Sequence, residues 1–233
     1  MARKDRAPNP PKRPQGPQRR SSPTDPAATA RQRRMLFLIA AAAVAAIALV
    51  LAIVFLTGGD GEDERATLEA AGCTLQVVPA VAGDHTATSL TATSNPKWNT
   101  NPPTSGPHND APAVWGFYDE PVPLPQTVHN LEHGGIVIHY GPDVPAAEIE
   151  KIRGFYTEDP NGIVVAPLQR LGDKISLAGW TAPDAAAGGN VDDGEGFLAK
   201  CSRFDEGAFS AFVDEHRYKG PERFPPESLT PGS

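Results

Sequence analysis

The sequence predicts an α+β, or small α/β, protein. We expect one compact domain outside the cytoplasm, with a small mixed sheet and long proline-rich loops, behind a single N-terminal transmembrane helix. Three observations support this prediction. Residues 35–57 are apolar and carry no charge. Short β-branched runs and segments of helical periodicity follow one another further along, which is typical of mixed sheets. Between these segments, residues 79–125 are rich in proline and show almost no periodicity.

The apolar run at 35–57 is long enough to cross a membrane. A helix of this length spans roughly 34 Å, and a hydrocarbon core is about 30 Å thick. Ten Lys and Arg residues lie within 1–34 and an acidic stretch follows at 60–64, so the positive-inside rule places the N-terminus in the cytoplasm. A buried core helix rarely lacks polar residues on every face, and the apolar region of a cleaved signal peptide is shorter. We therefore expect an uncleaved, single-pass signal-anchor in the cell membrane, with the C-terminal domain extracytoplasmic.

Composition divides the chain into five segments. The basic tail has almost no large apolar residues, so it cannot bury enough surface to fold. The longest segment has the size of a single domain. The predicted segments are a disordered cytoplasmic tail (1–34), the transmembrane helix (35–57), an acidic linker (58–69), the extracytoplasmic globular domain (70–226) and a frayed C-terminus (227–233).

Charge is divided unevenly along the chain. Beyond residue 57 there are 11 basic and 26 acidic residues, a net charge of −15, although the whole chain carries only −7. So acidic a region repels nucleic acid and attracts cations. The predicted partners are therefore the membrane, through 35–57, and either a small cation or an unidentified partner in the cell envelope. Nucleic acid is excluded as a partner of this region.

Each element of the domain is predicted from its local pattern. Apolar, β-branched runs bounded by glycine or proline indicate buried strands, and a proline followed by apolar residues at helical spacing indicates a helix. A strand, a helix and a strand in succession predict an α/β unit. The predicted strands are 74–78, 136–140, 162–167 and 174–180, and the predicted helices are 126–133, 145–157 and 206–218.

Two cysteines, Cys73 and Cys201, lie on the predicted outer side of the membrane, where disulfides persist. We expect them to pair, because an exported domain with two cysteines has one internal pairing open to it. On the chain-entropy model, closing a loop of about 130 residues stabilises a fold by roughly 4–5 kcal/mol. The alternative is a pair of buried free thiols. The sequence disfavours a catalytic dithiol, because the two cysteines do not form a C-x-x-C pair.

Two short motifs hold the residues that could support chemistry. The first, Pro-Pro-Thr-Ser-Gly-Pro-His, ends at His108, and the second, His-Asn-Leu-Glu-His-Gly-Gly, contains His129, Glu132 and His133. On a helix over 126–133, His129 and His133 share one face at about 5–6 Å between Cβ atoms, with Glu132 beside them. The pattern H-x-x-E-H is the inverted zincin arrangement, in which two histidines hold zinc and the glutamate activates water.

The candidate metal ligands are therefore His108, His129 and His133, with His85 as a weaker fourth, and the candidate catalytic base is Glu132. A zinc site needs three protein ligands with an open position, or four ligands if it is closed. Imidazole also suits copper, nickel and iron, so the predicted cofactor is a divalent ion such as zinc or copper. The alternative is that these histidines hydrogen-bond loop carbonyls and only tether the loops.

The remaining candidates are expected to have ordinary roles. His139 falls within the predicted strand 136–140, and His216, in the charged helix 206–218, is expected to face solvent. Ser105 lacks the strand-to-helix turn of a nucleophile elbow. Its expected role is turn formation beside Gly106.

The two histidine motifs and the segments around them resemble a known family. The succession runs from PPTSGPH through WGFYDEPVPLPQTVHNLEHGGIVIHYGPD to a strand ending near Trp180 and a Cys201-containing tail ending in GPE. It resembles the bacterial family catalogued as domain of unknown function 3105, over roughly residues 73–224. The resemblance implies a small single domain behind an N-terminal anchor, and it implies no activity. The motif positions are Pro102, Pro103, Thr104, Ser105, Gly106, His108, His129, Glu132, His133, Gly134 and Gly135.

Three functional hypotheses follow from the sequence. The first is a non-catalytic metal-binding or sensing module in which the histidines are ligands. The second is a metal-dependent hydrolase in which Glu132 is the general base on a metal-bound water. The third is a structural or interaction domain of the cell envelope, with the histidines tethering loops. The sequence does not decide whether the protein is an enzyme, nor its substrate or oligomeric state.

Overall fold

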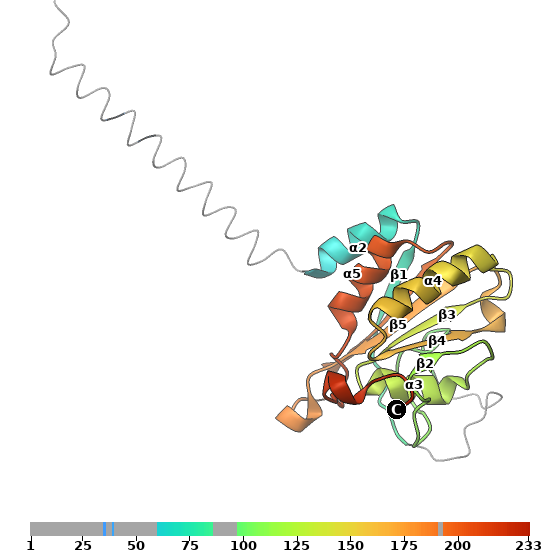
Figure 1. Ribbon diagram of the computed structural model, residues 1–233. Helices are drawn as coiled ribbons and strands as arrows, with labels where there is room; N and C mark the ends of the chain where they lie inside the picture. Colours follow the sequence, from blue (N-terminus) through green and yellow to red (C-terminus); the bar gives the residue numbers. More distant parts are fainter. Residues whose placement is uncertain (1–34, 36–38, 40–59, 86–96, 191–192) are drawn as a thin grey trace, which may run out of the picture. The chain divides into compact units, whose positions relative to one another are not determined.

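Among the residues that the structure describes, six strands form one mixed sheet in the order β1-β6-β5-β3-β4-β2 (Figure 1). The structure is a computed structural model that describes residues 35, 39, 60–85, 97–190 and 193–233. Strands β2, β4 and β3 pair in parallel, and β5, β6 and β1 continue the sheet in antiparallel pairs. The strands are β1 Thr74–Pro79, β2 Gly116–Phe117, β3 Ile136–Tyr140, β4 Ile163–Pro167, β5 Ile175–Thr181 and β6 Glu195–Cys201.

Helices cover both faces of this sheet. Helices α2, α4 and α5 lie over one face, and α3 lies over the other (Figure 1). Short 3₁₀ turns connect several of the elements. The helices are α2 Asp60–Ala70, α3 Leu124–Glu132, α4 Ala146–Glu158 and α5 Glu206–His216, and the 3₁₀ turns are Gln169–Leu171, Ala185–Ala187 and Pro226–Ser228.

The hydrophobic core lies on both faces of the central strands. Ile138 of β3 belongs to the cluster that α2, α4 and α5 cover, whereas its neighbour Val137 belongs to the cluster under α3. All five residues of β3 are buried. A strand covered on both faces has no solvent side, which explains why its sequence is a continuous apolar run rather than an alternating one.

The predicted α+β class with a mixed sheet is confirmed. The predicted helix at 126–133 begins two residues earlier, at Leu124, because Pro125 fits the first turn, where no backbone donor is needed. Strand β6 was not predicted. Its sequence, EGFLAKC, contains no β-branched residue. It forms a strand because β1 and β5 both pair with it.

The acidic linker predicted over 58–69 is corrected by the structure. Helix α2 occupies most of this segment and packs against α5. Leu68 is completely buried in the main core, and the Glu64 carboxylate lies 3.0 Å from His216 Nε2. Leu68 is the large apolar residue of this segment that enters the core. Because large apolar residues do not recur at helical spacing, the sequence of the segment does not indicate a helix. Helix α2 belongs to the same compact unit as the sheet, so the domain begins before residue 70.

The C-terminal segment, predicted to be frayed over 227–233, is held by backbone hydrogen bonds. Leu229 is buried, and its carbonyl accepts from the Gly162 N–H at 2.8 Å. The backbone N–H of Trp115 donates to the Ser233 carbonyl at 3.1 Å, and the Trp115 carbonyl accepts from the Gly232 N–H at 2.9 Å. Apart from Leu229 the segment has no large apolar residue, so its sequence does not reveal that Leu229 anchors it in the core.

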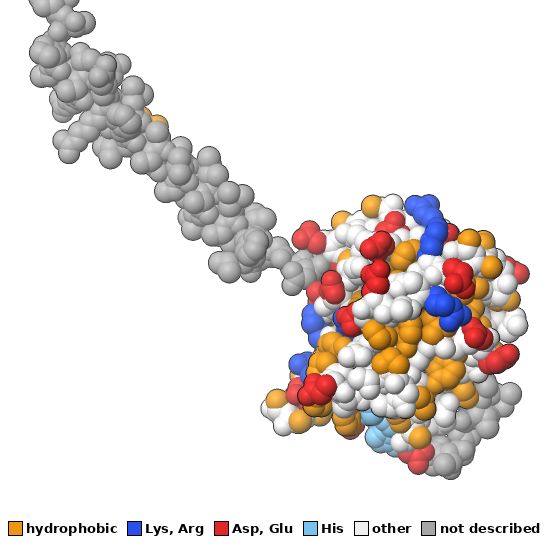
Figure 2. Space-filling view, viewed as in Figure 1, with side chains coloured by type: hydrophobic (Ala, Val, Ile, Leu, Met, Phe, Trp, Pro, Cys, Tyr) orange, Lys and Arg blue, Asp and Glu red, His pale blue; other side chains and the backbone are white. Residues whose placement is uncertain are grey.

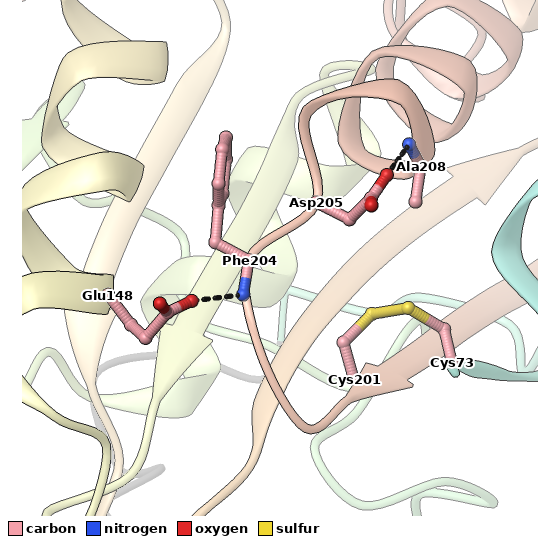
Figure 3. Close-up of a disulfide and its surroundings, with 6 residues drawn as sticks. All are labelled: Cys73, Glu148, Cys201, Phe204, Asp205 and Ala208. Atoms are coloured by element: carbon pink, nitrogen blue, oxygen red, sulfur yellow. Dashed lines mark hydrogen bonds between the residues drawn. A yellow bond between two sulfur atoms is a disulfide. The ribbon is translucent and has the colours of Figure 1, made fainter. Parts of the chain in front are cut away.

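The predicted disulfide between Cys73 and Cys201 is confirmed (Figure 3). It joins the residue before β1 to the last residue of β6, and both cysteines are buried. Side chains also hold the connection from β6 to α5. Glu148 accepts from the Phe204 N–H at 2.7 Å, and Asp205 caps α5 by accepting from Ala208 at 3.1 Å (Figure 3).

The predicted transmembrane run 35–57 lies outside the described residues, apart from Met35 and Ile39, which are helical. Within the described part of the chain, no helix combines the length and apolar character that crossing a membrane requires. The anchor and the tail at 1–34 therefore stay predictions.

Candidate metal centre

Helix α3 carries the histidine motif, and it is almost entirely buried against the sheet. Val128 and Leu131 pack into the cluster around Trp115 and Trp180. The helix ends at Glu132, and Gly134, two residues later, has a φ of +84°, the left-handed conformation that glycine adopts readily. Because β3 begins directly afterwards, the apolar face of α3 is fixed and its polar residues point away from the sheet toward the loops that cover it.

Four side chains that could hold a metal ion form one group: His85, His108, His129 and Glu132. Each offers one ligand atom, and these atoms lie within 4.8 Å of one another. Glu132 Oε2 is 2.9 Å from His108 Nε2 and 3.2 Å from His85 Nε2. The three imidazole rings surround the same point, with centroids 4.8 to 5.0 Å apart.

The buried rings of this group are oriented by backbone carbonyls. His108 Nδ1 lies 2.8 Å from the Gly106 carbonyl, and His129 Nδ1 lies 2.6 Å from the Asn109 carbonyl. A carbonyl can only accept, so Nδ1 carries the hydrogen in both rings. Nε2 is therefore the nitrogen that each ring presents to the group. The same second-shell hydrogen bond fixes the tautomer of histidines that ligate metals.

Two loops distant in sequence bring His85 and His108 together. The strand-like segments around these residues form an isolated parallel bridge, in which the His108 N–H donates to the Asp84 carbonyl at 3.2 Å. The Ser105 hydroxyl accepts from the Val81 N–H at 2.9 Å, so it joins two distant loops rather than forming the local turn that the sequence predicts. A Cβ at Gly83 would lie 2.9 Å from His108 Cε1, so the backbone can pass this close to the site only as glycine.

The proline-rich segment that follows His108 is clamped to α3 by Asn130. This buried amide accepts from the Ala113 N–H at 3.0 Å and donates to the Ala113 carbonyl at 2.8 Å. Together with the bond from His129 to Asn109, it holds both ends of the segment against the helix. At least part of the histidine motif therefore tethers loops, as one alternative from the sequence proposes.

Burial and neighbouring charges shift the pKa values of these groups in different directions. Burial opposes the charged form of His108, but hydrogen bonds to Glu132 and the Gly106 carbonyl outweigh it and raise the pKa. Burial also opposes ionised Glu132, yet the hydrogen bond from His108 and the nearby histidines lower its pKa. Burial lowers the pKa of His129, and burial together with His129 lowers that of His133 to about 4. His129 and His133 are therefore neutral near pH 7, the form in which imidazole binds metals.

The structure brings together three of the site residues that the sequence proposes, His108, His129 and Glu132, and adds the weaker candidate His85. His133 lies next to this group: its Nε2 is 3.0 Å from His129 Nε2. His133 is not part of the group that contains His85. It belongs to a second group of possible ligands, together with Glu132 and Glu222. Figure 2 shows histidine side chains reaching the surface at one place on this face of the domain, close to α3.

Sequence reasoning missed Asn130 and Glu222. Asn130 lies inside the histidine motif, and its position between His129 and Leu131 on a buried helix is the signal that could have identified it. Glu222 lies far along the chain from α3, and no local pattern connects the two.

The other two histidines lie away from the site. The prediction that His216 faces solvent is wrong, because it is 2% exposed and contacts Glu64 of α2. The acidic residues near it in sequence suggested a solvated face, but α2 covers that face. His139 is a strand residue as expected, and burial lowers its pKa to about 4.

Residues 89–228 match the family model described as Protein of unknown function (DUF3105). The match includes His108, His129, Glu132, His133 and Glu222, whereas His85 and Cys73 precede it. No curated protein and no solved structure matches the chain. Since the family model covers more than half of the sequence and includes both motifs that suggested the resemblance, the chain belongs to the DUF3105 family.

Proposed function

We propose that this protein binds a divalent metal ion, zinc or copper, through His85, His108, His129 and Glu132, in a domain held at the outer surface of the cell membrane. The location is inferred from the apolar run 35–57 and its basic flank. The acidic composition beyond residue 57 raises the local concentration of cations around the domain.

The orientation of the buried rings is the observation that carries the metal proposal. Nδ1 of His108 and of His129 each faces a backbone carbonyl, so both rings direct Nε2 toward the same small volume. If His108 and His129 only tethered loops, one hydrogen bond from each ring would be sufficient. Loop tethering does not require four ligand-type side chains to converge within 4.8 Å. Three imidazoles and one carboxylate also form a set that zinc and copper favour.

The spacing of the group is close to that of a bound site. Ligand atoms at about 2.0–2.1 Å from a tetrahedral zinc ion lie roughly 3.3 Å from one another. The contacts of Glu132 with His108 and His85, at 2.9 and 3.2 Å, already have this spacing. The exposed side chain of His85, 45% accessible, can adjust its position and leaves the site open to ions from solution.

The position of Glu132 favours binding over hydrolysis. Its Oε2 contacts two of the candidate ligands, so this carboxylate lies in the ligand set. A general base would have to stand beside a metal-bound water instead. We therefore propose a binding or sensing role, in which Glu132 is the fourth ligand.

Calorimetric titration of the purified full-length chain with zinc and with copper tests this proposal. The wild type should bind saturably, and His108→Ala and His129→Ala should each weaken binding at least about 100-fold, because each removes a ligand. Glu150→Gln is the matched control, because its carboxylate is exposed on α4 and away from the group. If the wild type binds neither ion saturably, the proposal is wrong and the role of these histidines is to tether loops.

Replacing Glu132 separates the two metal hypotheses. Glu132→Gln keeps the shape of the side chain and removes its charge. If Glu132 is a ligand, the variant should bind zinc at least about tenfold more weakly. If zinc affinity is unchanged and a hydrolytic activity of the wild type is lost, Glu132 is a base and the hydrolase hypothesis replaces ours.

A further inference from the structure

A second group of ligand-type side chains adjoins the first and shares one member with it. Glu132, His133 and Glu222 each offer one ligand atom, and these atoms also lie within 4.8 Å of one another. His133 Nε2 is 4.0 Å from Glu222 Oε2. The group is open to solvent, because the Glu222 side chain is 47% exposed.

Backbone contacts hold Glu222 at this position. The Glu222 N–H donates to the Glu132 carbonyl at 3.0 Å, and the Tyr218 N–H donates to the Gly134 carbonyl at 2.6 Å. The segment from 218 to 222 is thus paired with the end of α3. The chain brings a second carboxylate to the histidine motif although the two are far apart in sequence.

The contact between His129 and His133 connects the two groups. His129 Nδ1 faces the Asn109 carbonyl and carries the hydrogen, so its Nε2 is an acceptor. His133 Nε2, 3.0 Å away, must therefore be the donor. An ion that uses the lone pair of His129 deprives His133 of its acceptor. His133 therefore adjoins the first group directly, and its ligand atom also lies close to those of Glu132 and Glu222.

We propose that the site holds two divalent ions, bridged by the Glu132 carboxylate. His85, His108 and His129 complete the first position, and His133 and Glu222 complete the second. The inference rests on the proposed function, since the two positions share the Glu132 carboxylate. Pairs of ions that share a carboxylate lie about 3.5–4 Å apart in other proteins, which fits two adjoining groups of this size.

Counting bound zinc tests the second position. The full-length chain is dialysed against zinc chloride, and bound zinc is measured by elemental analysis. The wild type should hold two equivalents, and Glu222→Gln and His133→Gln should each hold one. Glu227→Gln is the matched control, because this exposed carboxylate is in the same C-terminal segment and should leave two equivalents. Glu222 is exposed, so its replacement by glutamine should not disturb folding.

Copper(II) provides an independent readout of the bridge. Two copper ions that share a carboxylate couple magnetically, so the integrated EPR signal of the wild type should fall well below two spins. Glu222→Gln should restore the signal of one isolated ion. A wild type with one equivalent, or a Glu222→Gln variant that retains two, overturns the second position and leaves the first intact. A wild type that binds no ion overturns the proposed function itself.

Discussion

At the scale of single residues, His139 shows how a strand can bury a titratable group without using it. It lies in β3 opposite Ser176 of β5, and both side chains are buried. Among the described residues, neither ring nitrogen of His139 nor the Ser176 hydroxyl has a hydrogen-bond partner. Burial of an unpaired polar group costs roughly 1–3 kcal/mol, which the apolar residues around the strand must offset.

His139 should make the stability of the domain depend on pH. Burial lowers its folded pKa to about 4 from an unfolded value of 6.5, so its contribution is intact above pH 6.5 and is lost as pH falls toward 4. The full loss should be about 3 kcal/mol. His139→Leu should lose less stability over this interval and be at least as stable at pH 7. Denaturant unfolding followed by tryptophan fluorescence measures both, since all three Trp residues lie beyond residue 57.

The comparison of the variant with the wild type isolates His139. The pKa values of His129 and His133 are also lowered, so both proteins should lose some stability in acid. Equal losses in wild type and His139→Leu would show that His139 does not resist protonation in the folded state.

At the scale of elements, the local sequence pattern predicts one part of the candidate site, and long-range contacts determine the other part. The spacing of His129, Glu132 and His133 could be read from the sequence because one helix sets it. His85 and Glu222 come from loops whose positions depend on the bridge at His108 and the backbone pairing at Glu132. Nothing local in the sequence encodes either contact. Part of the site was therefore predictable, and its other half required the fold.

The disulfide should stabilise the pairing of β1 with β6 and the helices attached to them. Cys73 and Cys201 are separated by 128 positions, and cross-linking so long a loop removes much of the entropy of the unfolded chain. Cys201→Ser should lower the free energy of unfolding by about 2–5 kcal/mol. Denaturant titration measures this loss, and mass analysis without reductant should detect no free thiol in the wild type. Two alkylatable thiols in the native protein would show that the bond does not form.

At the scale of the whole molecule, the two faces of the sheet have different roles. The face under α2, α4 and α5 holds the larger apolar cluster and the disulfide, and the face under α3 holds the candidate metal centre. The sequence predicted the central strands and their connecting helix because those segments are strongly apolar. It did not predict α2, β2 or β6, which depend on packing against α5 and on pairing within the sheet.

The topology of the chain is the prediction on which the compartment of the candidate metal centre depends. Ten basic residues precede the apolar run 35–57 and the acidic stretch 60–64 follows it, so the C-terminal domain should lie outside the membrane. The disulfide agrees with this placement, because such bonds persist in oxidising compartments. A reporter that is active only after export, joined to Ser233 through a flexible linker, should be active. Replacing the basic residues Arg31, Arg33 and Arg34 with glutamate should lower that activity. Activity of a cytoplasm-only reporter at the same position would instead place the centre inside the cell.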